Sequence, residues 1–142
     1  MREVFLDTSY LIASINPDDA RHEMAHEAVA ALSHVRFVTT DTVLTEFLGY
    51  FSGRPIHLRT AAPALVDTLR VPAACRVFHF GRNGFEAALR RYRQRLDKTY
   101  SLVDCHSVLV MEERGIRDIL TSDEHFLQEG FTCLLPTGGR AR

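Results

Sequence analysis

Cysteine is scarce in this sequence. The three cysteines, Cys75, Cys105 and Cys133, lie far apart, and none belongs to a CxxC pair. An odd and scattered set argues against a disulfide framework and against a cysteine-rich metal site. We therefore expect reduced thiols and a cytoplasmic protein.

Long apolar runs are missing as well. Asp7 interrupts the apolar stretch near the N-terminus, so we expect no signal peptide there. No other run approaches the roughly 20 apolar residues that a transmembrane helix needs. We expect a soluble protein with no membrane partner.

Length and composition are those of an ordinary globular domain. The chain has 142 residues, of which 46% are hydrophobic and 25% are charged. A chain of this length can bury a sufficient core without disulfides or structural metals. We expect a single domain over residues 1–136. The tail from 137 to 142 lacks apolar periodicity, and we expect it to be loose.

Hydrophobic periodicity predicts strands that alternate with helices. The expected strands cover residues 4–7, 36–40, 75–80, 118–123 and 131–135. The expected helices cover 8–15, 20–33, 41–51 and 57–69, and two more begin at capping boxes, Asn83 with Glu86 and Ser101 with Asp104. This order predicts an α/β fold with three layers, α/β/α, around a mainly parallel sheet of about five strands.

Four acidic residues lie in or just after apolar segments, where a solvated carboxylate is not expected. Asp7 and Asp123 follow predicted strands. Glu46 lies in the helix after the second strand, and Asp104 opens the helix that leads towards Asp123. Ligands of parallel α/β sheets bind beyond the carboxyl ends of the strands. Because buried, unpaired carboxylates are costly, such a group usually holds cations, and we expect a hard divalent metal ion.

Each acid also has a purely structural interpretation. Asp104 could be the acid of a capping box under Ser101, and Asp7 and Asp123 could cap the helices that follow them. Glu46 could lie on a solvated helix face. We favour the metal site, because otherwise four independent coincidences must meet at one sheet edge.

The sequences around these acids, taken in order, resemble those of the PIN-domain nucleases. They read FLDTSYLIA, TEFL, SLVDCHSVLVMEERGI and LTSDEHF, and the similarity extends from Val4 to about Leu135. Within that family the chain is most similar to the VapC-type toxins of type II toxin–antitoxin pairs. The resemblance implies a PIN fold and a magnesium- or manganese-dependent endoribonuclease that leaves a 5′-phosphate and a 3′-hydroxyl.

The resemblance also implies residue roles and partners. The family's catalytic and metal-binding acids match the four carboxylates above, and its supporting polar positions match Ser9 and Ser122. Glu124 adds negative charge where many relatives have a basic or neutral residue. The implied partners are an RNA substrate, a small antitoxin protein and a second copy of the chain in a homodimer. Tyr50, Phe51 and the apolar positions between 56 and 69 are a candidate surface for either protein partner.

Arginine dominates the basic residues, since Lys98 is the only lysine. Arginine suits forked contacts with phosphate groups. The candidate RNA-binding residues lie within the stretch from 82 to 95 and are Arg90, Arg91, Arg93 and Arg95. The alternative is a solvated helix face whose arginines pair with Glu86 or Asp97.

A competing motif lies at His22–His26, which reads HEMAH and matches the HExxH pattern of zinc metalloproteases. Glu46 follows His26 by 20 residues, a spacing that some of these enzymes use for the third zinc ligand. Charged Arg21 and Glu27 flank the motif, however, and a peptidase leaves the three aspartates unexplained. We keep it as a minor alternative.

Two further alternatives use the same acids. A phosphatase or phospho-acceptor domain also has an aspartate after its first strand, but Ser9 stands where it needs a second one. A catalytically inactive PIN-like module that binds RNA or protein is the stronger rival, and retention of all four acids argues against it. We expect His79, His106 and His125 to be surface or packing residues.

Overall fold

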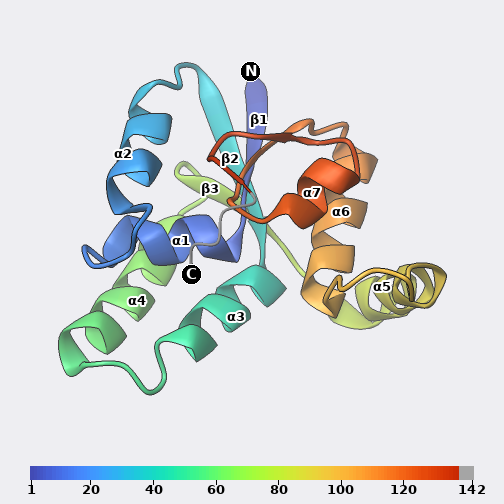
Figure 1. Ribbon diagram of the computed structural model, residues 1–142, viewed down its shortest axis with the longest axis horizontal. Coiled ribbons are helices and arrows are strands. Elements are labelled where there is room, and N and C mark those ends of the chain that lie inside the picture. Colours follow the sequence, from blue (N-terminus) through green and yellow to red (C-terminus); the bar gives the residue numbers. More distant parts are fainter. Residues whose placement is uncertain (138–142) are drawn as a thin grey trace.

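A five-stranded parallel sheet forms the centre of the computed structural model, which describes residues 1–137 (Figure 1). The strands stand in the order β3-β2-β1-β4-β5, and every neighbouring pair is parallel. Their bounds are β1 Arg2–Leu6, β2 Val35–Thr40, β3 Cys75–Phe78, β4 Asp118–Leu120 and β5 Thr132–Cys133. The predicted α/β class and parallel sheet are confirmed.

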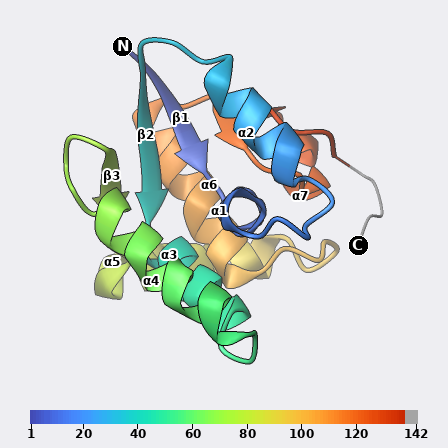
Figure 2. The ribbon, with the colours of Figure 1, turned by 90° about the vertical axis from the view of Figure 1, so that its left-hand side faces the viewer.

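Helices cover both faces of this sheet, as the three-layer prediction requires. Their bounds are α1 Thr8–Ile15, α2 His22–Ala30, α3 Asp41–Tyr50, α4 Ile56–Leu69, α5 Gly81–Gln94, α6 Leu102–Arg114 and α7 Glu124–Gln128. The first, second and fourth lie on one side of the sheet, and α5 and α6 lie on the other (Figures 1 and 2). Within residues 1–137, no helix combines the length and apolarity needed to cross a membrane.

The central strand β1 is apolar on both faces. Val4, Phe5 and Leu6 are all buried, as expected for a parallel strand with helices on either side. Phe47 of α3 and Met111 of α6 belong to the same core. The chain segments that leave the carboxyl ends of β1 and β4 therefore start from a rigid base.

The two predicted capping boxes have different outcomes. Ser101 and Asp104 form a complete box at the start of α6. The box at Asn83 is wrong, because α5 begins earlier, at Gly81, whose φ of +59° suits glycine. The N–H of Phe80 donates instead to the Asp41 carboxylate of α3, at 2.9 Å. A distant acid thus supports the start of α5.

Several predicted elements are longer than the observed ones. β4 ends at Leu120, and β5 contains only Thr132 and Cys133. β4 ends early because the next residue, Thr121, turns into the chain segment that contacts Asp7. The short helix α7 between these strands was expected only in the alternative interpretation, in which Asp123 caps a helix that follows it. The predicted loose tail lies, from residue 138 onwards, outside the described residues.

Candidate metal centre

Asp7 lies directly after β1 and is buried, with 4% of its surface exposed. Its Oδ2 accepts a hydrogen bond from the Thr121 hydroxyl at 2.7 Å and a longer one from the Ser9 hydroxyl at 3.4 Å. Although Asp7 precedes α1, its side chain makes no capping hydrogen bond, so the capping interpretation is wrong here. The carboxylate is fixed in place by the segment that follows β4.

Asp104 occupies the first turn of α6, and 9% of its surface is exposed. Its Oδ2 accepts the Ser101 N–H at 3.1 Å and lies 3.0 Å from Nδ1 of His125. The capping interpretation is therefore confirmed. It does not exclude metal binding, because a carboxylate has about four lone-pair positions and the cap uses one.

Asp123 follows β4 and caps α7 by accepting the His125 N–H at 3.0 Å. The His125 ring then lies between two carboxylates, with Nδ1 at 3.0 Å from Asp104 and 3.3 Å from Asp123. Ligand atoms of these three residues all lie within 4.8 Å of one another. The prediction that His125 is only a packing or surface residue missed this position.

Glu46 projects from α3, the helix that follows β2. The residue is exposed, but its carboxylate accepts a hydrogen bond from the buried Thr8 hydroxyl at the start of α1. Partial loss of solvent raises the pKa of Glu46, and the charges of Asp104 and Asp123 raise it further. The charges of Asp104 and Asp123 are thus felt at Glu46, and its partner Thr8 is the residue next to Asp7.

Hydroxyl groups brace the centre. Ser9 accepts the N–H of Ser122 at 3.1 Å and shares a hydrogen bond with Thr121 at 3.1 Å. The supporting position predicted at Ser9 is thus next to Asp7, whereas Ser122 contributes its backbone N–H. Thr8 and Thr121 were missed, although each is adjacent in sequence to a predicted element or acid.

The electrostatics of the group favour a cation. Burial raises the pKa of Asp7 to about 7, and the nearby charge of Asp104 adds to the effect. Burial likewise raises the pKa of Asp104. Within residues 1–137, no arginine or lysine pairs with Asp7, Glu46, Asp104 or Asp123. Carboxylate oxygens that no arginine or lysine neutralises fit a hard divalent metal ion.

The HExxH motif has a structural role. Nδ1 of His22 lies 2.6 Å from the carbonyl oxygen of Ala13, and Nε2 of His26 lies 2.9 Å from that of Ser14. Both carbonyls belong to the last turn of α1, where helix carbonyls lack intrahelical partners. Within residues 1–137, the one compact group of three potential metal ligands is Asp104, Asp123 and His125, and it leaves out both of these histidines as well as Asp7 and Glu46. The histidines differ from these two acids in that their ring nitrogens already contact carbonyl oxygens of α1. The motif therefore joins α2 to the end of α1.

The candidate RNA-binding arginines on α5 divide into two pairs. Arg91 is bound to Glu129 at 2.7 Å and to Glu112 at 3.2 Å, and Arg95 lies 3.5 Å from Glu129. Arg90 and Arg93 are exposed. Arg91 and Arg95 therefore form ion pairs, as the alternative expected, but with Glu112 and Glu129 as the acidic partners. RNA binding by Arg90 and Arg93 stays a prediction.

The candidate partner surface needs one correction. Tyr50 is 38% exposed, and Ile56 at the start of α4 is 76% exposed. Phe51, in contrast, is fully buried in the main core and packs edge-to-face against Phe47. Phe51 ends α3 facing inwards and is not available to a partner.

Comparisons with known proteins agree with this geometry. The family model described as PIN domain matches residues 4–130. The chain is 31% identical over 133 residues to the 23S rRNA-specific endonuclease VapC20 of Mycobacterium tuberculosis, covering 94% of this chain and 98% of that protein.

Solved structures give the same result. The crystal structure of M. tuberculosis VapC20, described as a Sarcin-Ricin loop cleaving toxin, matches with a TM-score of 0.82 and 28% identity, over 94% of this chain and 99% of that one. VapBC2 from Rickettsia felis, bound to a DNA fragment from its promoter, matches with a TM-score of 0.61 over 96% and 99% of the two chains. Its 11% identity supports the fold alone.

Proposed function

This chain belongs to the PIN-domain family, and we propose that it is an endoribonuclease that uses magnesium or manganese ions to cut RNA, as the toxin of a type II toxin–antitoxin pair. The observation that carries the proposal is the group of four acids at one sheet edge, three of them aspartates fixed by hydroxyl, backbone or imidazole groups. Such a group is suited to hold divalent metal ions beside a phosphodiester.

The four carboxylates have different proposed tasks. Asp7 and Asp104, the two most buried, provide the main oxygen ligands, and Asp123 and Glu46 complete the set. When bound, the metal supplies Lewis acidity that activates water and offsets the charge building up on the phosphate. Thr121, which donates to Asp7, keeps that carboxylate oriented towards the shared centre.

His125 is proposed as a positioning residue. Its Nδ1 lies between Asp104 and Asp123, and its Nε2 lies 2.9 Å from the Thr99 hydroxyl. The ring therefore holds the two carboxylates in a fixed relation, as residues that contact metal ligands commonly do. Tyr100 packs against the ring with centroids 5.0 Å apart.

The substrate and partners follow from the relatives. A structured ribosomal RNA, in particular the sarcin–ricin loop of 23S rRNA, is the proposed target, because a relative that covers nearly the whole chain is named for that activity. A small antitoxin is the proposed protein partner, and the exposed residues Tyr50 and Ile56 belong to the surface proposed for it or for a homodimer.

Cleavage of a panel of RNAs tests the proposal. The panel includes ribosomal RNA and a sarcin–ricin stem–loop, incubated with magnesium, manganese, zinc or a chelator. We expect cuts with magnesium or manganese that disappear with the chelator and in Asp104→Asn. Asp67→Asn, which removes an exposed carboxylate on α4, is the matched control and should cut normally. Cleavage by Asp104→Asn at the wild-type rate, or a protein that cuts no RNA yet needs zinc to hydrolyse peptides, contradicts the proposal.

A further inference from the structure

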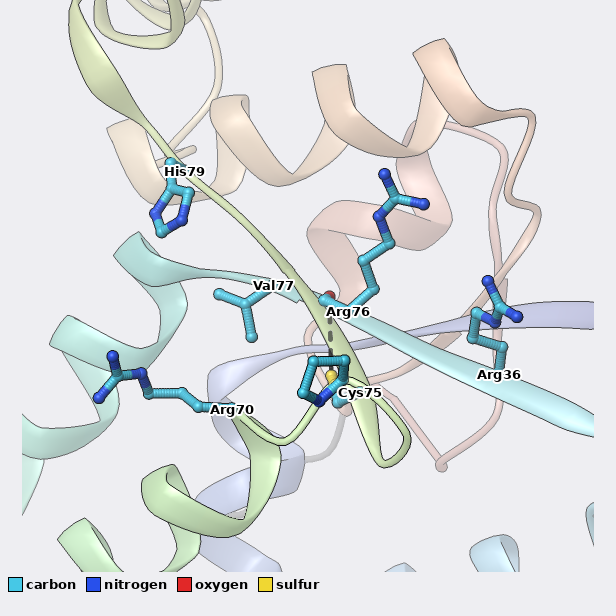
Figure 3. A pocket seen from close by; sticks show the side chains of 7 residues that line it. Arg36, Arg70, Cys75, Arg76, Val77 and His79 are labelled. Carbon is cyan, nitrogen blue, oxygen red and sulfur yellow. Dashed lines mark hydrogen bonds between the residues drawn. The ribbon is translucent and has the colours of Figure 1, made fainter.

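A second charged feature lies on the outer edge of the sheet, along β3. A cavity of about 510 Å³ opens there, and its basic lining comes from Arg36, Arg70 and Arg76 (Figure 3). Because β3 is the last strand on this side, no further strand among residues 1–137 pairs with its outer edge. We call these three residues the arginine edge.

The three arginines of the cavity lining come from different parts of the chain. Arg76 of β3 is in register with Val38 of β2, and Arg36 lies two residues before Val38. Since alternate residues of a strand share a face, Arg36 and Arg76 project to the same side, as Figure 3 shows. Arg70 extends from the end of α4 and points away from the Arg76 side chain, so it lines a different part of the cavity.

The arginine edge carries positive charge that the fold does not neutralise. All three residues are exposed, and none pairs with a carboxylate in the part of the chain that the structure describes. The nearby Glu3 is already held by Arg114 at 2.8 Å. That hydrogen bond lowers the pKa of Glu3, and the charges of Arg36 and Arg76 lower it further.

Stacking keeps one of the guanidinium groups ordered. Arg76 lies over the Phe78 ring, 4.9 Å from its centroid, and Arg114 lies over the same ring at 4.8 Å. A stacked guanidinium loses less freedom when it binds an anion, and its planar fork of N–H groups matches phosphate oxygens.

The other lining residues do not suit metal binding or covalent chemistry. Cys75 is buried, and burial raises the pKa of its thiol to about 12, so it remains a protonated thiol. His79 faces Asp41, with Nδ1 and Oδ2 3.3 Å apart. The chemistry that remains is recognition of an anion.

We propose that the arginine edge binds the phosphate backbone of the RNA substrate at a point away from the bond that is cut. The inference rests on the proposed function. The metal centre itself is acidic and repels a polyanion, and the net charge of −1 supplies no overall attraction, so the chain needs local basic contacts elsewhere.

The position of the edge sets the size of the RNA. Two strand spacings, about 10 Å, separate β3 from β1 across the sheet. Arg36 is also in register with Glu3, four residues before Asp7, which adds about 13 Å along the strands. Only an RNA that extends several nucleotides from the cleaved bond reaches both places. The arginine edge should therefore favour folded RNA over very short oligonucleotides.

RNA binding without cleavage tests this inference. The dissociation constant for a labelled sarcin–ricin stem–loop is measured in chelator over a series of potassium chloride concentrations. The variants are Arg36→Gln/Arg70→Gln, the charge-preserving Arg36→Lys/Arg70→Lys, and the control Arg59→Gln/Arg117→Gln, which removes two exposed arginines outside the cavity. Thermal unfolding verifies that all variants fold.

The expected result is a smaller salt dependence for the first variant alone. Losing two phosphate contacts should lower the slope of log K against log salt by about 1.4 to 1.8. The lysine variant should keep most of the slope, and the control should keep all of it. An unchanged slope in the glutamine variant, or an equal fall in the control, overturns the inference. If the wild type binds RNA in this arginine-dependent way but cuts none with any metal, the proposed function fails and the inference stands.

Discussion

Replacement of Asp7 by asparagine should stabilise the metal-free protein while abolishing cleavage. Asp7 is buried next to Asp104, and these surroundings raise its pKa from 3.8 to about 7. The folded state therefore holds this proton more tightly than the unfolded state does. As the pH rises through the range between the two values, the unfolded chain ionises first and stability is lost.

The size of the effect follows from the shift. A change from 3.8 to about 7 is equivalent to about 4 kcal/mol above pH 7, and to about 2 kcal/mol at pH 5. Asparagine has nearly the same shape, keeps an oxygen to accept from Thr121 and carries no charge. The unfolding free energy of Asp7→Asn should accordingly exceed that of the wild type by at most about 4 kcal/mol above pH 7 and at most about 2 kcal/mol at pH 5.

Urea unfolding in chelator at pH 5 and pH 8 measures both differences. Asp67→Asn should change the free energy by less than about 0.5 kcal/mol at either pH, because surface substitutions usually do. Saturating manganese should reduce or reverse the advantage of Asp7→Asn, since a bound ion stabilises the folded wild type. The reasoning is refuted if Asp7→Asn gains the same unfolding free energy at both pH values. It is also refuted if the wild type is more stable than Asp7→Asn in chelator at pH 8.

Three further variants separate the roles of His125, Thr121 and the HExxH motif. His125→Ala should lower manganese affinity or the cleavage rate by about 10- to 100-fold, because the ring positions two carboxylates; wild-type values in both assays contradict that role. Thr121→Val removes the 2.7 Å hydrogen bond to Asp7 and should cost about 2 kcal/mol of unfolding free energy at pH 8, with a smaller cost at pH 5, where Asp7 is mostly protonated. The double variant His22→Ala/His26→Ala should lose up to about 1 kcal/mol per hydrogen bond and cut RNA at the wild-type rate, whereas a loss of cleavage without unfolding would give the HExxH motif a functional role.

The positions of the acids near the carboxyl ends of the strands could be predicted from the sequence because they follow from the topology. An apolar strand that ends at Asp7 and a capping box at Ser101 are local patterns, and both appear in the structure. Parallel strands then bring the ends of β1 and β4 together without any further information. The capping role of Asp104 and its place in the cluster were posed as alternatives, and the structure supports both at once.

Contacts between segments that are distant in sequence could not be predicted from local sequence patterns. Arg91 pairs with Glu129, 38 positions away, whereas the expected partners lay nearby in sequence. His125 reaches Asp104 across 21 positions, and its place depends on the turn that begins α7. Phe51 was assigned to a surface because the end of an amphipathic helix does not reveal which way its last residue faces.

Calorimetric titration of manganese into the wild type and Asp104→Asn tests the proposed metal centre most directly. Neither RNA nor antitoxin is needed, so an unsuitable substrate cannot hide the result. We predict binding to the wild type, at least tenfold weaker binding to Asp104→Asn, and wild-type binding to Asp67→Asn. Equal affinity in all three proteins, or no binding to the wild type, contradicts the assignment of these carboxylates as a metal centre.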